Sequence, residues 1–272
     1  MKKSLLFAAA ILFAASANAQ EVKVTKASDN PFKFSSTAHY YTILLDEETQ
    51  AANLKEEQVT YLGPNGSWDD PSTTHFLDVW EGTLSGADAT GKNSFGVPGG
   101  YQAWEILSGW YGCGYRIADK VDVSSIKGNG GFHFAVKSDD ANMSYSFKVV
   151  SGAGEGKITV GGDNPLCDFT RDGSWYNFDI SLADLQKLGV DFSKDNAFTG
   201  NLLEITQNAD VTQGQKVYYD AIFFWVEGGA DGIETVEAKA NENAPVYNLA
   251  GQRVDKNFKG IAVKNGKKFM VK

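Results

Sequence analysis

Aromatic residues beside acidic or amide residues are the feature of this sequence best suited to chemistry. The chain has 6 tryptophans and 11 tyrosines, whose flat rings can stack on the C–H face of a sugar while carboxylates and amides bind its hydroxyls. In residues 76–81, apolar residues alternate with others, as in a strand that buries one face. Leu77 and Val79 then face a core, so Asp78 and Trp80 share the opposite face. This pair is a candidate ligand-binding surface.

A second stretch repeats the arrangement. Tyr176 and Phe178 are expected to face the core, which places Trp175 and Asn177 on the outer face of their strand. The alternative for both outer tryptophans is burial, because tryptophan is highly buried on average and long loops or the C-terminal tail can cover an outer face. Trp104 alternates with Ile106, and Trp225 lies in the apolar residues 217–226, so both are expected in the core.

Two further tryptophans lie in glycine-rich segments. Trp68 belongs to the turn-rich residues 63–71, and Trp110 lies within residues 109–112. An exposed tryptophan on a loop is a candidate ligand-binding residue, because loops often carry function. The alternatives are that the Trp68 ring folds back on the domain, and that the glycines beside Trp110 serve a bulge or close backbone approach.

Catalytic and metal-binding patterns are weak. The three histidines show no H-E-x-x-H spacing, no G-x-S-x-G motif is present, and nothing singles out a pair among the 34 acidic residues. Cys113 and Cys167 are too few for a thiolate zinc site, and they form either one disulfide or two buried thiols. Asp220, alone in the apolar residues 217–226, needs a hydrogen-bond or arginine partner if it is buried.

The elements that position these residues are short strands. Strand-like runs separated by glycine- or aspartate-rich breaks recur along the chain, and helix is scarce. Residues 182–188, with Ser181 as N-cap and Gly189 as the stop, form the best helix candidate, and residues 46–58 hold another turn or two. This pattern predicts an all-β fold, namely a two-sheet antiparallel jelly-roll-like sandwich with a small C-terminal β appendage. The strand-like runs are residues 40–45, 76–81, 101–107, 132–136, 145–149, 157–160, 176–180, 202–206 and 217–226.

The N-terminus has the form of a secretory signal peptide. Lys2 and Lys3 precede the apolar residues 5–15, and residues 17–19 (Ala-Asn-Ala) form a small-x-small cleavage site. The run is too short for a transmembrane helix. We therefore expect a protein that is secreted or on the cell surface, with the periplasm as an alternative. The net charge of −9 disfavours nucleic acid as a partner.

The composition changes near the C-terminus. Residues 1–19 are the expected signal peptide, residues 20–229 the β-sandwich, residues 230–243 a polar linker and residues 244–272 a basic β segment. In this last segment, Asn265-Gly266 is a strong signal for a two-residue hairpin turn.

Two parts of the chain resemble known families. Residues 246–254 with the sequence VYNLAGQRV, together with residues 259–261 and 265–268, are similar to the sorting domains of the type IX secretion system of Bacteroidota, although the segment is shorter than those domains. Residues 76–83, 93–96 and 109–115 resemble secreted β-sandwich domains of the same bacteria, which are grouped with carbohydrate-binding modules of jelly-roll or galactose-binding-like fold. That resemblance implies a structural calcium with Asp220 as a ligand.

The sequence thus favours a secreted, non-catalytic glycan-binding sandwich that uses surface aromatics. The ligand-binding candidates are Trp80, Asp78, Trp175, Asn177, Trp68 and Trp110. One alternative is a structural or adhesive surface protein that docks another protein, and a second is a glycoside hydrolase of a sandwich family. The partner is a glycan or a cell-surface component, and the oligomeric state stays open.

Overall fold

The chain folds into two units, each of which is described by itself. In the computed structural model, contacts divide the chain into Met1–Gly232 and Ile233–Lys272. The structure describes residues 21–65, 73–194 and 197–228 of the first unit and the strands of the second. The expected signal peptide, Trp68 and the expected linker lie outside the described residues.

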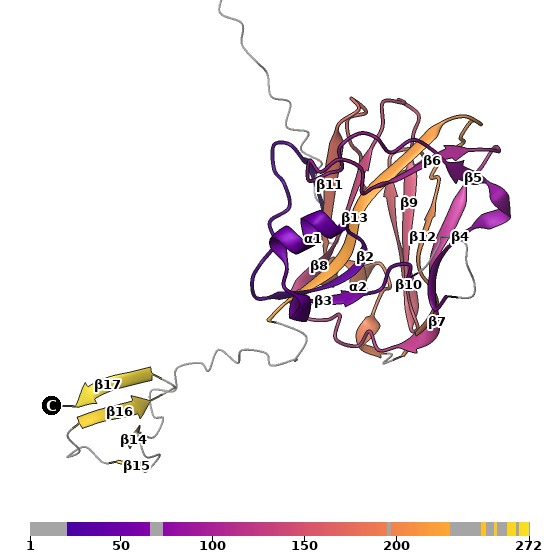
Figure 1. Cartoon of the computed structure of the whole chain (residues 1–272). Coiled ribbons are helices and arrows are strands. Elements are labelled where there is room, and N and C mark those ends of the chain that lie inside the picture. The colour runs from indigo at the N-terminus through magenta and orange to yellow at the C-terminus, as the bar shows by residue number, and fades with distance from the viewer. Residues whose placement is uncertain are drawn as a thin grey trace, which may run out of the picture. The chain divides into compact units, whose positions relative to one another are not determined.

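The first unit is an all-β sandwich of an eight-stranded and a five-stranded sheet, here named sheet A and sheet B (Figure 1). Sheet A has the order β1-β11-β8-β13-β2-β3, with β6 pairing to β13 and β5 to β6. Its pairs are antiparallel except for β2 and β3, which run parallel. Its strands are β1 (Val22–Lys26), β2 (Ala38–Leu44), β3 (Val59–Tyr61), β5 (Leu84–Gly86), β6 (Gln102–Ile106), β8 (Gly130–Lys137), β11 (Trp175–Ser181) and β13 (Lys216–Glu227).

Sheet B is antiparallel and has the order β10-β9-β12-β7-β4. The predicted jelly-roll-like sandwich class is therefore confirmed. The strands of this sheet are β4 (His75–Val79), β7 (Gly112–Val121), β9 (Tyr145–Ser151), β10 (Gly154–Val160) and β12 (Phe198–Thr206).

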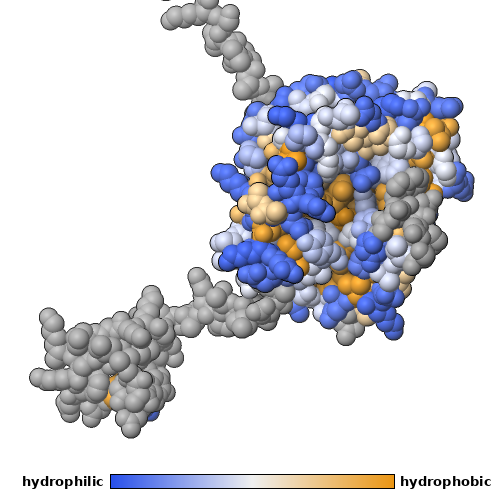
Figure 2. Space-filling model, in the orientation of Figure 1, coloured by the Kyte–Doolittle hydropathy of each residue, from blue (hydrophilic) through white to orange (hydrophobic). Residues whose placement is uncertain are grey.

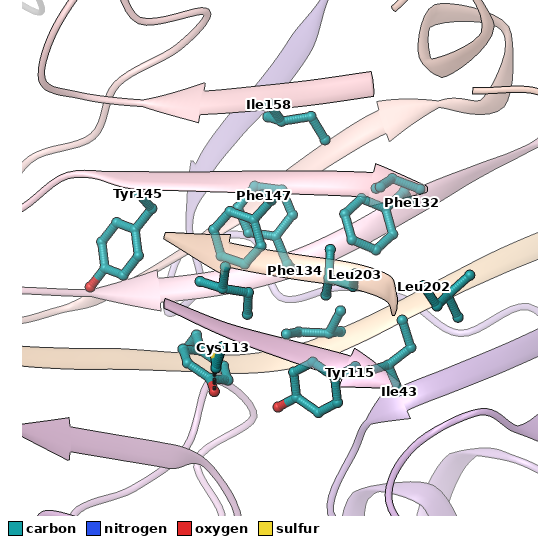
Figure 3. Close-up of a cluster of buried hydrophobic side chains, with 14 of the residues drawn as sticks. Ile43, Cys113, Tyr115, Phe132, Phe134, Tyr145, Phe147, Ile158, Leu202 and Leu203 are labelled. Atoms are coloured by element: carbon teal, nitrogen blue, oxygen red, sulfur yellow. Dashed lines mark hydrogen bonds between the residues drawn. The ribbon is translucent and has the colours of Figure 1, made fainter. Parts of the chain in front are cut away.

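The main core lies between the inner faces of the two sheets (Figure 3). Phe134 of sheet A stacks on Phe147 of sheet B with ring centroids 4.0 Å apart. Strand β13 lies between β8 and β2, as its apolar character on both faces predicts. Trp104, 2 % exposed, belongs to this core as expected.

A second apolar cluster lies on the outer face of sheet A. Phe223 on β13 contacts Phe32 and Phe34, with ring centroids 5.0 and 5.8 Å apart, and Phe34 contacts Phe95 at 5.5 Å. Residues 27–37 and 87–100 therefore cover this face, and Trp225 packs against the same cluster. Sheet A is buried on both sides in this region.

Both short α-helices begin at a capping side chain, and the one predicted from the sequence, Ser181, is confirmed. Helix α1 (Glu47–Asn53) begins at Asp46, whose carboxylate accepts a hydrogen bond from the Thr49 N–H at 2.8 Å. Helix α2 (Leu182–Lys187) begins at Ser181, whose Oγ accepts from the Asp184 N–H at 3.0 Å. None of the helices in the described ranges is long and apolar enough to cross a membrane. The described residues also include the 3-10 turns η1 (Glu56–Gln58), η2 (Trp80–Gly82) and η3 (Phe192–Lys194).

Two local expectations were wrong. The strand predicted over residues 76–81 ends at Val79, because Glu81 and Gly82 adopt φ angles of +50° and +63° and turn the chain. Strand β7 (Gly112–Val121) was not predicted, because its first residues are glycine-rich and resemble a loop. For the cysteines, the structure favours the alternative of free thiols: Cys113 is buried and Cys167 half-buried, and both are unpaired.

The second unit is a four-stranded antiparallel sheet with the order β15-β14-β16-β17. Lys264 pairs with Lys267, a register that leaves a two-residue connection and confirms the predicted hairpin. The strands are β14 (Val246–Asn248), β15 (Arg253–Val254), β16 (Gly260–Lys264) and β17 (Lys267–Val271).

Candidate functional site

The structure brings Trp80 and Trp110 together on the outer face of sheet B. Both indoles lie against Gly112 at the start of β7: a Cβ at this position would overlap the Trp80 ring and lie 3.2 Å from Trp110. Both tryptophans are half-buried, so part of each ring is accessible. Residue 112 is therefore glycine because a side chain there would overlap the Trp80 ring.

Hydrogen bonds hold the backbone of this pair. The Thr83 hydroxyl donates to the Trp80 carbonyl at 2.9 Å and accepts from the Gly112 N–H at 3.2 Å, which ties turn η2 to β7. The Ser108 hydroxyl donates to the Trp110 carbonyl at 2.7 Å. The indoles therefore project from fixed backbone positions rather than from free loops.

A row of charged groups crosses the same face. The strand register aligns Asp78 on β4 with Gly114 on β7, Glu204 on β12 and Lys148 on β9. Lys148 contacts Glu204 at 2.5 Å, and this hydrogen bond raises the pKa of the lysine. Residues directly opposite one another on neighbouring strands share a face, so the row lies beside the tryptophan pair.

Arg116 completes the surface. Its guanidinium lies 3.5 Å from the Asp78 carboxylate and 5.6 Å from the centroid of the Phe76 ring. Both partners of the ion pair stay accessible, with Arg116 46 % and Asp78 30 % exposed. We name Asp78, Trp80, Trp110, Arg116 and Glu204 the outer-face site.

The outer-face site has the chemistry that a polyhydroxylated ligand requires. The accessible parts of the indoles offer flat apolar surface, and Asp78 and Arg116 offer an acceptor and several donors at fixed positions. The sequence named Asp78, Trp80 and Trp110 as candidates, and the structure places Arg116 and Glu204, which it did not name, on the same face. The missed signal is the alternation of Tyr115 and Ile117 in the core with Arg116 outside it, which becomes visible only once residues 112–121 are treated as a strand.

Trp175 and Asn177 lie elsewhere and are covered. Both face outward from sheet A, but Trp175 is 9 % and Asn177 3 % exposed. The Trp175 indole N–H donates to the Lys92 carbonyl at 2.7 Å, and the Asn177 amide donates to the Asn30 carbonyl at 3.1 Å. The face assigned from the sequence is right and the expected accessibility is wrong, because residues 27–37 and 87–100 lie on top. Trp68 lies outside the described residues.

The covered face of sheet A contains an aromatic cage occupied by a lysine of the chain itself. The Lys137 ammonium lies 4.3 Å from the Tyr101 ring centroid and 4.8 Å from those of Trp175 and Tyr218. Cation–π attraction of this kind is strongest where the cation is partly desolvated. The Trp175 ring therefore has a structural role.

Asp220 is held by hydrogen bonds from the covering segment. It is fully buried, and its Oδ2 accepts hydrogen bonds from the Ser94 N–H at 2.8 Å and the Ser94 hydroxyl at 2.6 Å. Burial raises the pKa of this carboxyl to about 6, although the Ser94 hydrogen bonds oppose the rise. Within the described ranges, no three His, Cys, Asp or Glu side chains gather where they could hold a metal ion. Oδ2 faces hydrogen-bond donors, and the several further oxygen ligands that calcium requires are not supplied by any acidic cluster among the described residues.

Comparison with known proteins leaves the family of the chain open. No family model and no curated protein matches it. Among solved structures, it is similar to a family 11 carbohydrate-binding module of the cellulosomal cellulase Lic26A-Cel5E of Clostridium thermocellum, with 15 % identity and a TM-score of 0.33 over 56 % of this chain and 87 % of that one. It is also similar to an exo-beta-agarase, with 12 % identity and a TM-score of 0.34 over 54 % of this chain and 23 % of that one. Neither value is high enough to assign a ligand or an activity.

Proposed function

We propose that the sandwich is a non-catalytic glycan-binding module and that the outer-face site binds the glycan. The observation that carries this proposal is the placement of two half-buried indoles beside an accessible acid–arginine pair on one face. A sugar ring lies with its C–H face on Trp80 or Trp110, and its hydroxyls bind Asp78 and Arg116.

The other functions considered from the sequence have less support. Docking of a protein usually needs a contiguous apolar patch. Among the described residues, however, only Tyr61 and Leu107 are large hydrophobic residues with high exposure. A glycoside hydrolase needs an acid with a raised pKa that can reach the substrate. Asp220 has the raised pKa, but it is fully buried.

The test is retention of the mature chain on a glycan array and in affinity gels containing polysaccharide. We expect Trp80→Ala and Trp110→Ala each to weaken binding about tenfold or more, since aromatic anchors dominate such contacts. Lys23→Ala, an exposed charge on β1 of the other sheet, is the matched control and should bind like the wild type. Wild-type retention by both tryptophan variants would refute the outer-face site.

We also propose that the chain is exported and that its C-terminal unit is a sorting segment, on the basis of the N-terminal pattern and the basic tail. Fractionation of the producing cells, followed by N-terminal sequencing, tests this. Export predicts a mature N-terminus near Gln20, and deletion of residues 244–272 should keep the protein from the cell surface. An intact Met1 in the cytoplasmic fraction would contradict it.

A further inference from the structure

A groove separate from the outer-face site lies beside β2, α1 and the start of β4. Its volume is about 840 Å³, which is within the usual range for ligand sites. Figure 2 shows this side of the sandwich hollowed beside α1, with hydrophobic residues at the bottom of the hollow and hydrophilic residues on the side of α1. The sequence did not indicate this site. The residues that line the groove include Leu45, Glu47, Gln50, Tyr61, Asn65 and His75.

Close backbone packing fixes one wall of the groove. Gly63 lies so near β2 that a Cβ there would overlap the Ile43 carbonyl oxygen, and its N–H donates to the Thr42 carbonyl at 3.1 Å. Two hydrogen bonds join Asn65 to His75 at the start of β4. The Asn65 N–H donates to the His75 carbonyl at 3.0 Å, and the Asn65 Oδ1 accepts from the His75 N–H at 3.2 Å. The wall is thus formed before any ligand arrives, which lowers the entropic cost of binding.

Tyr61 is the reason to consider this groove a binding site. At 59 % it is the most exposed large hydrophobic side chain among the described residues. Its hydroxyl accepts a hydrogen bond from the Gln50 side chain on α1, which orients the ring at the groove. A ring held in one orientation with most of its surface accessible offers a flat apolar face and a polar hydroxyl to a ligand.

The remaining lining defines the partner. Gln50, Asn65 and His75 supply polar side chains to the lining, and Leu45 supplies an apolar one. The Gln50 amide also donates to the Tyr61 hydroxyl, and the Asn65 amide donates to the Thr74 hydroxyl at 2.7 Å. Glu47 is the one acid in the lining, and the described lining contains neither lysine nor arginine. Such a surface can hydrogen-bond hydroxyls, and it offers no cation for a phosphate or sulfate group.

We propose that this groove is a second carbohydrate-binding site, which takes a neutral oligosaccharide with one sugar ring stacked on Tyr61. The ligand class rests on the glycan-binding function proposed above, but the residues are different. His75 begins β4 and Trp80 follows its last residue, Val79; the four steps from His75 to Val79 alone span about 14 Å at about 3.4 Å per residue. Both sites can therefore be occupied at once.

The experiment is titration calorimetry and affinity electrophoresis of the mature chain with soluble β-glucan, xylan, mannan, galactan and one sulfated polysaccharide. Tyr61→Ala should weaken binding of the neutral polysaccharide that the wild type retains by about fivefold to tenfold. Tyr61→Phe keeps the ring and should stay within about twofold. Trp80→Ala and the double variant separate the two sites. Leu107→Ala, an exposed residue that does not line the groove, is the control.

Hydrogen exchange provides a readout that needs no variant. Bound polysaccharide should slow the exchange of backbone amides in residues 59–65.

The variants and the exchange data together decide between the two sites. Loss of binding in Trp80→Ala alone, with no protection of residues 59–65, overturns the groove and leaves the outer-face site standing. Loss in Tyr61→Ala alone supports the groove and overturns the outer-face site. Retention of none of the polysaccharides overturns both, and preference for the sulfated one overturns the neutral ligand.

Discussion

Replacement of Asp220 by asparagine should reveal how much the buried carboxylate costs the fold. Asp220 is fully buried on β13, and its Oδ1 has no hydrogen-bond partner among the described residues. Burial raises its pKa from 3.8 to about 6. The folded protein thus holds the proton more tightly than the unfolded chain does, and the protonated carboxyl is the form that the fold favours.

The magnitude follows from the shift. A rise from 3.8 to about 6 corresponds to about 3 kcal/mol at about 1.4 kcal/mol per pKa unit. This stability is fully present below pH 3.8 and is lost as the pH rises through about 6. Asp220→Asn stays neutral at every pH, and its amide oxygen can still accept both hydrogen bonds from Ser94. At pH 7.5 the variant should therefore be more stable than the wild type, by up to about 3 kcal/mol.

Urea unfolding at intervals between about pH 4.5 and 7.5 tests this expectation. The free energy of unfolding of the variant, minus that of the wild type, should rise across this range. Asp172→Asn is the matched control: the hydrogen bond from Lys26 lowers the pKa of exposed Asp172 to about 2, so its contribution is lost only as the pH falls below about 4. A variant-minus-wild-type difference at Asp220 that does not change with pH would refute the reasoning.

Further predictions concern the cage, the tryptophan pair and the cysteines. Lys137→Met should lower the free energy of unfolding by about 1–2 kcal/mol, because the ammonium contacts three aromatic rings; an unchanged thermal midpoint would contradict this. Gly112→Ala should displace the Trp80 ring and cost about 1–3 kcal/mol, visible as a shift in tryptophan fluorescence and lower stability in urea; wild-type emission and stability would count against the packing. Burial raises the pKa of Cys113 and of Cys167 to about 12, so both thiols should react with a disulfide reagent at pH 8 only slowly until the protein is unfolded; fast reaction of the native protein would show that a thiol is accessible.

The strands of the sandwich could be predicted from the sequence where apolar and polar residues alternate. Phe132 and Phe134 lie in the core between the sheets, and the polar residue between them, His133, packs on the other side of sheet A against Phe223. The central position of β13 also followed from its composition. Strand β7 could not be found in this way, because Gly112 and Gly114 supply no side chain to alternate. They are glycine because the Trp80 and Asn201 side chains occupy the space above them, which only the folded structure reveals.

The candidate site shows where alternation stops being informative. Trp80 and Trp175 have the same sequence signal, and both lie on outer faces, yet one is half-buried and the other covered. The difference is made by contacts between distant parts of the chain, such as the hydrogen bond from Trp175 to Lys92, 83 residues away. Alternation specifies the face of a side chain and says nothing about what covers that face.

Asp220 is a feature of the sequence that relates to the segments covering the outer face of sheet A, residues 27–37 and 87–100. A carboxylate that points outward from a strand apolar on both faces needs a hydrogen-bond donor if that face is covered. The donor is Ser94, 126 residues away, which belongs to a segment lying over the sheet. The same segment also covers Trp175. Residues 87–100 therefore contribute to the burial of both Asp220 on β13 and Trp175 on β11. Sheet B has no comparable buried acid among its described residues, and its outer face is where Trp80 and Trp110 remain accessible.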